Sequence, residues 1–550
     1  MSLPFPAAVI QAVLKAGVGE FVVCAGARNS ALVVVLAALL DKVRLWQHFD
    51  ERAAGFFAIG RIRATGMPVA VVTTSGTAVA ELLPAIIEAH YQGLPLVALT
   101  ADRPLDYRDS GAPQAIEQAF LFPYYATEFD LWEPLDLAGE KFTFTPAWDK
   151  QQPLHVNVCL EEPGAEDLPA LRESGEVMRE ELRCSQQSKA CGDEATGDSR
   201  RLWTAASIAA LRGKPPTSPT SRRLLLAGEL LDDEIPIITG HISNSAAIVS
   251  AEAASGLREL PELQDRLLRC GDATLRHLPV RDVWRFGGVP SARFWRDLED
   301  RPDITVQSFS RSGHTGLARI KEPVHFTGFP PLEYPTPSTE FLSRDAALYT
   351  RLGELLIRFP NAEPALFRRL SQVIPQGATV FTGNSLAVRE WNLCAEYGRG
   401  HRVHVLRGAN GIDGNLSAFL GIAADREEAW CVTGDLTALY DLSAPWMLRQ
   451  LPAGRRRFVV IQNGGGKIFS RLPSLLGLND RERALMENPH NIRLQGWAEM
   501  WSMDHVSGGA DILDSLSALA DHAVIELHPD AEQTEAFWAA WAEAEKEVWS

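Results

Sequence analysis

The sequence contains no run of about 18 consecutive apolar residues, and this absence argues against a membrane-spanning helix. It also lacks a basic N-terminal segment followed by an apolar core, so we expect no secretory signal. The 7 cysteines are scattered without the paired spacing of a metal site, and they do not predict a disulfide framework. Together these absences predict a cytoplasmic protein.

Basic residues are in deficit, since 53 Lys and Arg face 70 Asp and Glu and give a formal net charge of -17. This balance argues against a nucleic-acid partner, because phosphate binding needs a basic surface. Small anionic substrates remain compatible with it, since they respond to local arginines. A G-x-G-x-x-G after the first predicted strand is also missing, which argues against a nicotinamide-dependent dehydrogenase.

Apolar runs typical of buried strands alternate with helical patterns in the first and last thirds of the chain, and helices are predicted at 51–64 and 77–92. This alternation predicts an α/β fold with parallel sheets, and the two thirds resemble each other in pattern. The predicted strands, each followed by a turn, are 21–26, 68–76, 95–104, 378–385, 402–411, 428–436 and 456–466.

The regions between these thirds have a different composition. Residues 170–201 are rich in polar and charged side chains and predict a linker. Residues 202–335 have weaker apolar runs and predict another α/β unit. Residues 327–340 are rich in proline and predict a second linker.

The strongest candidate site combines two turns in the last third. Asp435 ends the segment 432–435, and Asn463 begins the segment 463–466. Their separation, 463 − 435 = 28 positions, fits one helix between two parallel strands, so both turns can lie at one sheet edge. Carboxylate and amide oxygens there can hold a hard cation such as Mg²⁺, and a glycine beside Asn463 lets a backbone carbonyl approach it. Two unrelated turns are the alternative.

Glu51 precedes a helix of small and apolar residues, so its carboxyl is predicted at the entrance of a buried surface. A carboxyl in such a place has a raised proton affinity and can donate a hydrogen bond to a ring nitrogen. A solvated acid at a helix N-terminus is the alternative, stabilised by the helix dipole.

Two further turns follow strands in the first third. Residues 73–77 offer hydroxyls and free helix N–H groups to an anion, although simple helix capping also explains them. Residues 26–30 are similar, and Arg28 adds a planar donor suited to carboxylates. An exposed, solvated arginine is the alternative there.

Taken together, these motifs resemble the thiamine diphosphate enzymes, and more narrowly the 2-succinyl-5-enolpyruvyl-6-hydroxy-3-cyclohexene-1-carboxylate synthases of menaquinone biosynthesis. The resemblance is dense at 20–120 and 378–475 and weak in the middle, where RFGGVPSARFW (285–295) carries it. The remaining motifs are HFDERAAGFFAIG, VVTTSGTAVAELLPAIIEA, LTADRP with GAPQAIEQ, FTGNSLAVR, RGANGIDG, VTGDLTALYDL and NGGGKIFSRLP.

The resemblance implies three α/β domains: pyrimidine-binding (1–180), central (200–335) and diphosphate-binding (345–550). It implies a homodimer or a dimer of dimers, in which Glu51 of one subunit meets Asp435 and Asn463 of the other. The implied reaction is thiamine diphosphate-dependent decarboxylation of 2-oxoglutarate and 1,4-addition of the succinyl-semialdehyde carbanion to isochorismate.

Residue roles follow from the motif positions. Glu51 would hydrogen-bond the aminopyrimidine and, with Arg28 and Gln114, serve catalysis. The metal, Mg²⁺ or Mn²⁺, would be held by Asp435, Asn463 and the carbonyl of Gly465. Other implied cofactor contacts are Ser75, Gly76, Thr77, Gly408, Ile412, Gly434, Leu436, Ile468 and Phe469. The carboxylate derived from 2-oxoglutarate would face Ser385, Arg389 and Arg407, and isochorismate would face Arg28, Arg103, Gln114 and Arg293.

Four positions depart from the family pattern. Ala27 and Asn410 each stand where the family has a serine, Pro113 stands in place of an asparagine, and Ala292 stands in place of a lysine. These changes affect the acceptor side more than the cofactor side. The competing hypotheses are an acetolactate synthase-like or 2-oxo acid decarboxylase activity, and a catalytically silent homologue acting as a scaffold.

Overall fold

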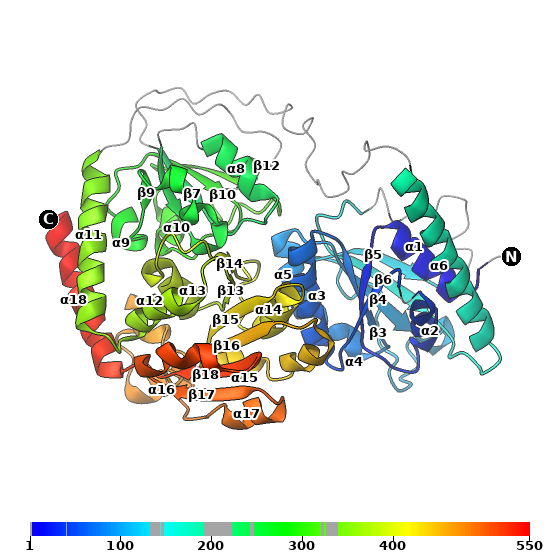
Figure 1. Ribbon diagram of the computed structural model, residues 1–550. Helices are drawn as coiled ribbons and strands as arrows, with labels where there is room; N and C mark the ends of the chain where they lie inside the picture. Colours follow the sequence, from blue (N-terminus) through cyan, green and yellow to red (C-terminus); the bar gives the residue numbers. More distant parts are fainter. Residues whose placement is uncertain are drawn as a thin grey trace. The chain divides into compact units, whose positions relative to one another are not determined.

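The computed structural model describes residues 3–39, 41–132, 144, 148–191, 223–242, 247–320, 324–325 and 339–550. Their strands form three six-stranded sheets, and every strand pair in them is parallel. The chain divides into two compact units. The first comprises 1–202, 416–425 and 443–452, and the second comprises 203–415, 426–442 and 453–550. The α/β architecture with flanked parallel sheets is therefore confirmed (Figure 1).

The first sheet lies between two helical layers (Figure 1). Apolar side chains of α1, α2 and α6 form one core with the sheet, while α3 and α5 pack on the other side. The elements are α1 (Phe5–Lys15), β1 (Glu20–Val23), α2 (Ser30–Ala38), β2 (Arg44–Gln47), α3 (Glu51–Thr65), β3 (Val69–Thr73), α4 (Thr77–Ala80), α5 (Leu83–Gln92), β4 (Leu96–Asp102), η1 (Leu105–Tyr107), β5 (Thr127–Leu131), β6 (Leu154–Cys159) and α6 (Leu168–Cys191).

The central sheet belongs to the second unit, and its two shortest strands lie at its edges. Its elements are β7 (Arg223–Ala227), α8 (Glu234–Ile242), β8 (Ile248–Ala251), η3 (Ala253–Ser255), η4 (Leu257–Glu259), η5 (Pro261–Leu263), β9 (Leu267–Leu268), α9 (Asp272–Leu275), β10 (Asp282–Phe286), α10 (Arg293–Asp297), η6 (Leu298–Asp300), β11 (Thr305–Ser310) and β12 (Val324–His325).

The third sheet shares a core with α11, α12, α13 and α18. Most of α14, and η7, belong to the first unit. The elements are α11 (Thr339–Arg358), α12 (Glu363–Val373), β13 (Thr379–Thr382), α13 (Leu386–Cys394), β14 (Arg402–His404), α14 (Asn415–Ala423), β15 (Glu428–Gly434), α15 (Asp435–Tyr440), η7 (Ala444–Gln450), β16 (Arg455–Ile461), η8 (Phe469–Arg471), η9 (Pro473–Leu475), α16 (Asp480–Glu487), α17 (Gln495–Met500), β17 (Asp504–Gly508), η10 (Ala510–Ala518), β18 (His522–Leu527) and α18 (Ala531–Trp549).

The first and third sheets have the same topology. Their orders, β2-β1-β3-β4-β6-β5 and β14-β13-β15-β16-β18-β17, are identical when the strands are counted along the chain. The order reverses between β1 and β3 and between β13 and β15. In open α/β sheets, ligands bind beyond the carboxyl ends of the strands at such reversal points. The first and last thirds of the chain, which resemble each other in sequence pattern, therefore have the same sheet topology.

The central sheet has a different order, β12-β11-β10-β7-β8-β9, which reverses between β7 and β10. The turns after these strands touch each other. A Cβ on Gly228 would lie 2.1 Å from the carbonyl oxygen of Gly288, so glycine is required for this approach. Backbone thus closes this reversal point, whereas polar side chains such as Arg28, Ser75, Ser385 and Asp435 follow the strands at the reversal points of the other two sheets.

Two predicted elements differ from the structure. Residues 170–191 of the predicted linker belong to α6, because Leu171 and Met178 lie on a buried face, and Gly175 lets the helix approach Val35 and Ala38 of α2. Residues 192–201 of that linker lie outside the described residues. The predicted helix 77–92 is interrupted after α4, and α5 starts with Pro84 in its first turn. Most of the proline-rich segment 327–340 lies outside the described residues.

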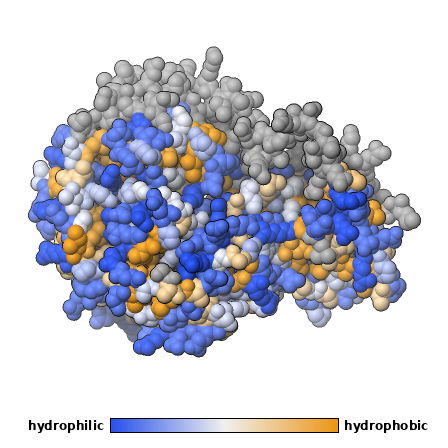
Figure 2. All heavy atoms as spheres, in the orientation of Figure 1, coloured by the Kyte–Doolittle hydropathy of each residue, from blue (hydrophilic) through white to orange (hydrophobic). Residues whose placement is uncertain are grey.

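The visible surface is mostly hydrophilic (Figure 2). On the face that Figure 2 shows, hydrophilic residues predominate, and hydrophobic ones form small groups between them. None of the helices in the described ranges combines the length and the apolar character needed to cross a bilayer.

Candidate functional site

Asp435 lies where β15 ends and α15 begins, and its side chain is buried. The neighbouring strand β16 runs in register, with Gly434 opposite Ile461, so the turn 463–466 reaches the same sheet edge. One carboxylate oxygen of Asp435 accepts hydrogen bonds from Gly464 N at 2.8 Å and Gly465 N at 2.9 Å, and the other accepts from Leu436 N at 2.7 Å. The predicted meeting of these two turns is confirmed.

Of the two polar atoms of the Asn463 side chain, the nitrogen is hydrogen-bonded and the oxygen is not. Its Nδ2 donates to both carboxylate oxygens of Glu363, at 3.1 and 3.2 Å. Its Oδ1 is buried and has no hydrogen-bond partner. A buried amide oxygen is costly to leave unpaired, so this atom is suited to a ligand. Glu363 therefore orients Asn463 with its oxygen available.

The donor set fits a hard cation. An anionic carboxylate and an amide oxygen are oxygen ligands of the type Mg²⁺ and Mn²⁺ accept. The carbonyl of Gly465 already accepts a hydrogen bond from Lys467 N at 2.8 Å, and its second lone pair remains for a cation. No cluster of three or more His, Cys, Asp or Glu suited to a metal occurs among the described residues.

The glycines of this turn are required by space and by backbone conformation. Gly464 and Gly465 have φ of 81° and 128°. A Cβ on Gly465 would lie 2.5 Å from the carbonyl oxygen of Glu487. The ring of Phe469, which follows the turn 463–466, packs against Gly466.

Glu363 belongs to a buried acidic pair with Glu390, and Arg471 acts electrostatically on both carboxyls. Burial raises the pKa of both groups; the charge of Glu363 adds to the shift of Glu390, and the charge of Asp435 adds to the shift of Glu363. Arg471 opposes the shift. Glu363, Glu390 and Arg471 thus form a cluster of charged groups, and Glu363 is the member that hydrogen-bonds Asn463.

A second group follows β13 and β14 in the same unit. Ser385 has a φ of 69°, which is uncommon for a residue with a side chain and typical of functional turns. Arg389, one turn along α13, donates to the carbonyl oxygen of Ser385. Arg407 is buried and donates to Asn384 Oδ1 and to the carbonyl oxygen of Val289. The positive charges of Arg389 and Arg407 both act electrostatically on one buried carboxyl group, that of Glu252.

Glu252 is fully buried and accepts from the backbone N and the hydroxyl of Ser291. Burial raises its pKa, although Arg407 and Arg389 oppose the shift. Arg407 donates to the side chain of Asn384 and Arg389 donates to the carbonyl oxygen of the next residue, Ser385, so both guanidinium groups adjoin the same turn. The structure thus brings two guanidinium groups and Ser385 to the carboxyl edge of the third sheet.

Glu51 is the first residue of α3, whose N-cap Asp50 accepts from Ala53 N. The side chain is half-buried, and its pKa is raised by burial and by the nearby charges of Asp50 and Glu81. A raised pKa of Glu51 is the direction that the sequence predicts. Behind it, α3 approaches α14 so closely that a Cβ on Gly60 would lie 2.1 Å from the carbonyl oxygen of Ala418.

The turns after β1 and β3 also touch. A Cβ on Gly26 would lie 2.5 Å from Cβ of Thr74. Gly76 has a φ of 85°, and the backbone of Gln114 lies directly against it. The structure therefore places Ser75, Gly76, Thr77 and Gln114 beside the reversal point of the first sheet.

Arg28 is buried, so the alternative of an exposed, solvated arginine is wrong. Its guanidinium is buried, donates to the carbonyl oxygen of Leu160 at 3.0 Å, and pairs with Glu162 at 3.1 Å. Arg103 stacks on Tyr107. Arg293 is exposed at the start of α10 and pairs with Asp297 at 3.5 Å. The predicted acceptor residues are thus divided between two units.

Several supporting residues were missed by sequence reasoning. Glu363 lies 100 positions before Asn463, and no local motif marks it. Gln118 ends the motif GAPQAIEQ, but nothing in the sequence distinguishes it from an exposed glutamine, and only the structure shows that it is buried. Glu252 lies in the middle region, where the resemblance to the family is weak, and Ser291 lies in the stretch 285–295 that carries that resemblance.

Comparison with known proteins identifies the family of the chain. Residues 6–121 match the family model of the thiamine pyrophosphate enzyme, N-terminal TPP binding domain. A 2-succinyl-5-enolpyruvyl-6-hydroxy-3-cyclohexene-1-carboxylate synthase of Akkermansia muciniphila is 40% identical over 96% of this chain and 97% of that protein. Proteins of the same name are 38% identical over 98% of both chains in Bdellovibrio bacteriovorus, and 34% identical over 90% of this chain and 87% of that protein in Chloroflexus aurantiacus. The chain therefore belongs to the 2-succinyl-5-enolpyruvyl-6-hydroxy-3-cyclohexene-1-carboxylate synthase family of thiamine diphosphate enzymes.

Proposed function

We propose that this chain decarboxylates 2-oxoglutarate and adds the remaining four-carbon fragment to isochorismate in a 1,4 fashion. The observation that carries this function is the pair of guanidinium groups, Arg389 and Arg407, which adjoin the turn after β13 at the same sheet edge as Asp435 and Asn463. Two arginines beside a cofactor site suit a 2-oxo acid that carries a second carboxylate, because guanidinium binds carboxylate in planar pairs.

Thiamine diphosphate, when bound, supplies the chemistry that makes a decarboxylated 2-oxo acid nucleophilic. Asp435, Asn463 Oδ1 and the carbonyl of Gly465 would hold Mg²⁺ or Mn²⁺ against its diphosphate. Gly408, Gly434 and Leu436 would lie along the diphosphate side, and Ile412, Ile468 and Phe469 would provide apolar contacts. Ser75, Gly76 and Thr77 would contact the pyrimidine side.

Glu51 holds and moves a proton at the pyrimidine ring. Its raised pKa keeps a larger fraction of the carboxyl protonated near neutral pH than an exposed glutamate would have. A protonated carboxyl can donate to a ring nitrogen and then recover the proton. On the acceptor side, Arg28, Arg103, Gln114 and Arg293 would receive isochorismate.

The assembly is part of the same proposal. Glu51 and the metal-binding turn belong to different compact units of the chain, and the family resemblance implies that two copies share each active site. We therefore propose a cytoplasmic homodimer or dimer of dimers.

A product assay tests this function. The protein is incubated with 2-oxoglutarate, isochorismate, thiamine diphosphate and Mg²⁺, and the products are identified by mass spectrometry. We expect loss of CO₂ and a product that joins the four-carbon fragment to intact isochorismate. A parallel reaction with pyruvate alone tests the acetolactate type of chemistry. Turnover of pyruvate without reaction of isochorismate would overturn the assignment.

Glu363→Ala should weaken Mg²⁺ binding by about 10–100-fold, because the amide of Asn463 would lose the acceptor that orients it. Glu363→Gln retains an acceptor oxygen and should restore most of the affinity. Mg²⁺ affinity is measured by the quenching of tryptophan fluorescence at a fixed thiamine diphosphate concentration. Equal Mg²⁺ affinities in the alanine variant and the wild type would contradict the orienting role of Glu363.

A further inference from the structure

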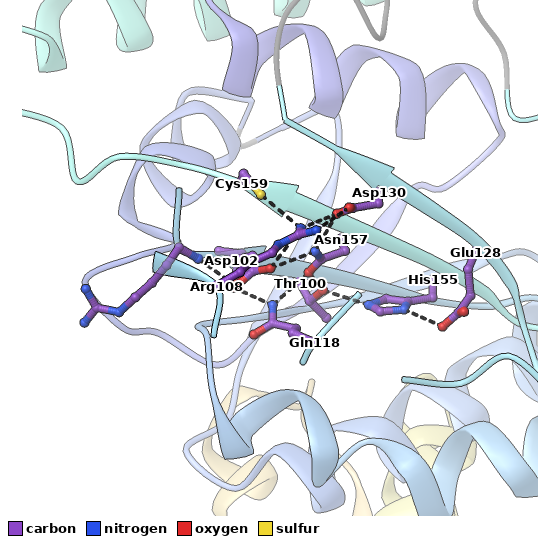
Figure 3. A network of polar contacts seen from close by, with 11 residues as sticks. Thr100, Asp102, Arg108, Gln118, Glu128, Asp130, His155, Asn157 and Cys159 are labelled. Carbon is purple, nitrogen blue, oxygen red and sulfur yellow. Dashed lines mark hydrogen bonds and ion pairs between the residues drawn. The ribbon is translucent and has the colours of Figure 1, made fainter. Parts of the chain in front are cut away.

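A buried network of polar side chains lies beneath the carboxyl edge of the first sheet (Figure 3). Asn157 of β6 is its centre. Its Oδ1 accepts from Gln118 Nε2 at 2.8 Å and from the hydroxyl of Thr100 at 3.1 Å. Its Nδ2 donates to Asp102 at 3.0 Å and Asp130 at 2.8 Å. All hydrogen-bonding positions of this amide are used, so its orientation is determined.

One arm of the network ends on Arg108. The guanidinium makes two hydrogen bonds of 2.8 Å to the carboxylate of Asp130 and a third of 3.4 Å to Asp102. Burial would raise the pKa of Asp130, but the hydrogen bonds from Arg108 and Asn157 outweigh it and lower that pKa. Asp102 also accepts from the backbone N of Arg103 at 2.7 Å. This arm secures the beginning of the segment 103–122.

The other arm ends on the turn after β3. Gln118 is 1% exposed, and its Oε1 accepts from Gly76 N at 3.1 Å. Its Nε2 donates to the carbonyl oxygen of Ala101 at 2.9 Å and to Asn157. Gln118 therefore ties the end of the segment 103–122 to the turn of Gly76.

Gln114 lies between these two anchors. It has a φ of 58°, which is unfavourable for a residue with a side chain, and its backbone packs against Gly76. The side chain itself is exposed. A strained conformation persists only when the surrounding structure enforces it, and here the anchors on either side provide that restraint.

We propose that Gln118 is a positioning residue for the acceptor substrate. Its amide, fixed by Asn157 and Ala101, holds Gly76 and the segment 103–122 in one register and thereby sets the place of Arg103 and Gln114. This role rests on the proposed function, in which Arg103 and Gln114 receive isochorismate. All members of the network belong to the first unit, whereas the residues proposed to face 2-oxoglutarate, Ser385, Arg389 and Arg407, belong to the second.

Gln118→Met tests this role, because methionine keeps the volume of glutamine but makes none of its three hydrogen bonds. The KM for isochorismate should rise on the order of 10- to 100-fold, while the KM for 2-oxoglutarate stays within about two-fold of wild type. Amide hydrogen exchange should become faster in 103–122 and stay unchanged in β1 and β3. The matched control is Gln152→Met, which removes one hydrogen bond to Thr127 at the opposite edge of the sheet and should change neither KM.

The outcomes are distinguishable. A wild-type enzyme that does not use isochorismate would disprove the proposed function and, with it, this role. A wild-type enzyme that does use it, together with equal changes of both KM values or no change in Gln118→Met, would overturn the positioning role alone. Gln118→Glu keeps the acceptor for Gly76 N but loses both donated hydrogen bonds when ionised and one of them when protonated, so the KM for isochorismate should still rise. Wild-type kinetics in Gln118→Glu would also overturn the role.

Discussion

Replacing Glu51 by glutamine should reduce turnover on the order of 10²–10⁴-fold, the usual contribution of a positioned general acid or base. Glutamine has nearly the same shape and can still hydrogen-bond a ring nitrogen, but it cannot give up and recover a proton. The affinity for thiamine diphosphate should therefore change little. Turnover is followed by the consumption of 2-oxoglutarate and isochorismate, and cofactor affinity by calorimetric titration.

The stability of this variant separates a chemical effect from a folding defect. Burial raises the pKa of Glu51, so ionisation is less favourable in the folded chain than in the unfolded one. At pH values above the folded pKa, the charged carboxylate lowers the free energy of unfolding. Glu51→Gln removes this charge and should melt at the same temperature as wild type or slightly higher. Wild-type turnover in Glu51→Gln would refute the proton-transfer role.

The fold was predictable where strands are long and buried on both faces. The continuous apolar runs at 68–76 and 428–436 correspond to β3 and β15, because parallel strands with helices on both sides contain few polar residues. The central sheet was harder to predict. Its edge strands β9 and β12 contain two residues each, which is too short for a periodic pattern.

The candidate site was predictable where a turn directly follows a strand. Asp435 and Asn463 meet because parallel neighbours end at one edge, and this needs only the strand positions. The supporting contacts depend on distant parts of the chain. Nothing near Asn463 marks Glu363 as its partner, and nothing near Arg28 shows that Glu162 pairs with it. Such contacts arise from tertiary packing, which periodicity does not describe.

Replacing Asp435 by asparagine should weaken Mg²⁺-dependent binding of thiamine diphosphate by at least about 10–100-fold. The carboxylate is the only anionic member of the proposed ligand set, and it also accepts from Gly464 N and Gly465 N, which shape the turn. Asparagine keeps one acceptor oxygen but offers N–H groups where the second oxygen was. The dissociation constant is measured by calorimetry over a series of Mg²⁺ concentrations.

Asp480→Asn is the matched control, because it removes one negative charge from an exposed position of α16 and should leave the affinity unchanged. Thermal melting shows whether Asp435→Asn remains folded. If the folded variant binds thiamine diphosphate with the Mg²⁺ dependence of the wild type, Asp435 is not a metal ligand.

Combining the two defective chains distinguishes a shared active site from one built within a single chain. Dimers that contain one Glu51→Gln subunit and one Asp435→Asn subunit are isolated with two different affinity tags. If each site takes Glu51 from one subunit and Asp435 from the other, one of the two sites carries both changes and the other carries neither. Such dimers should then recover about half of the wild-type activity, as the two-fold symmetry requires. If each site lies within one chain, both sites keep one change and the mixed dimers should be as inactive as their parents.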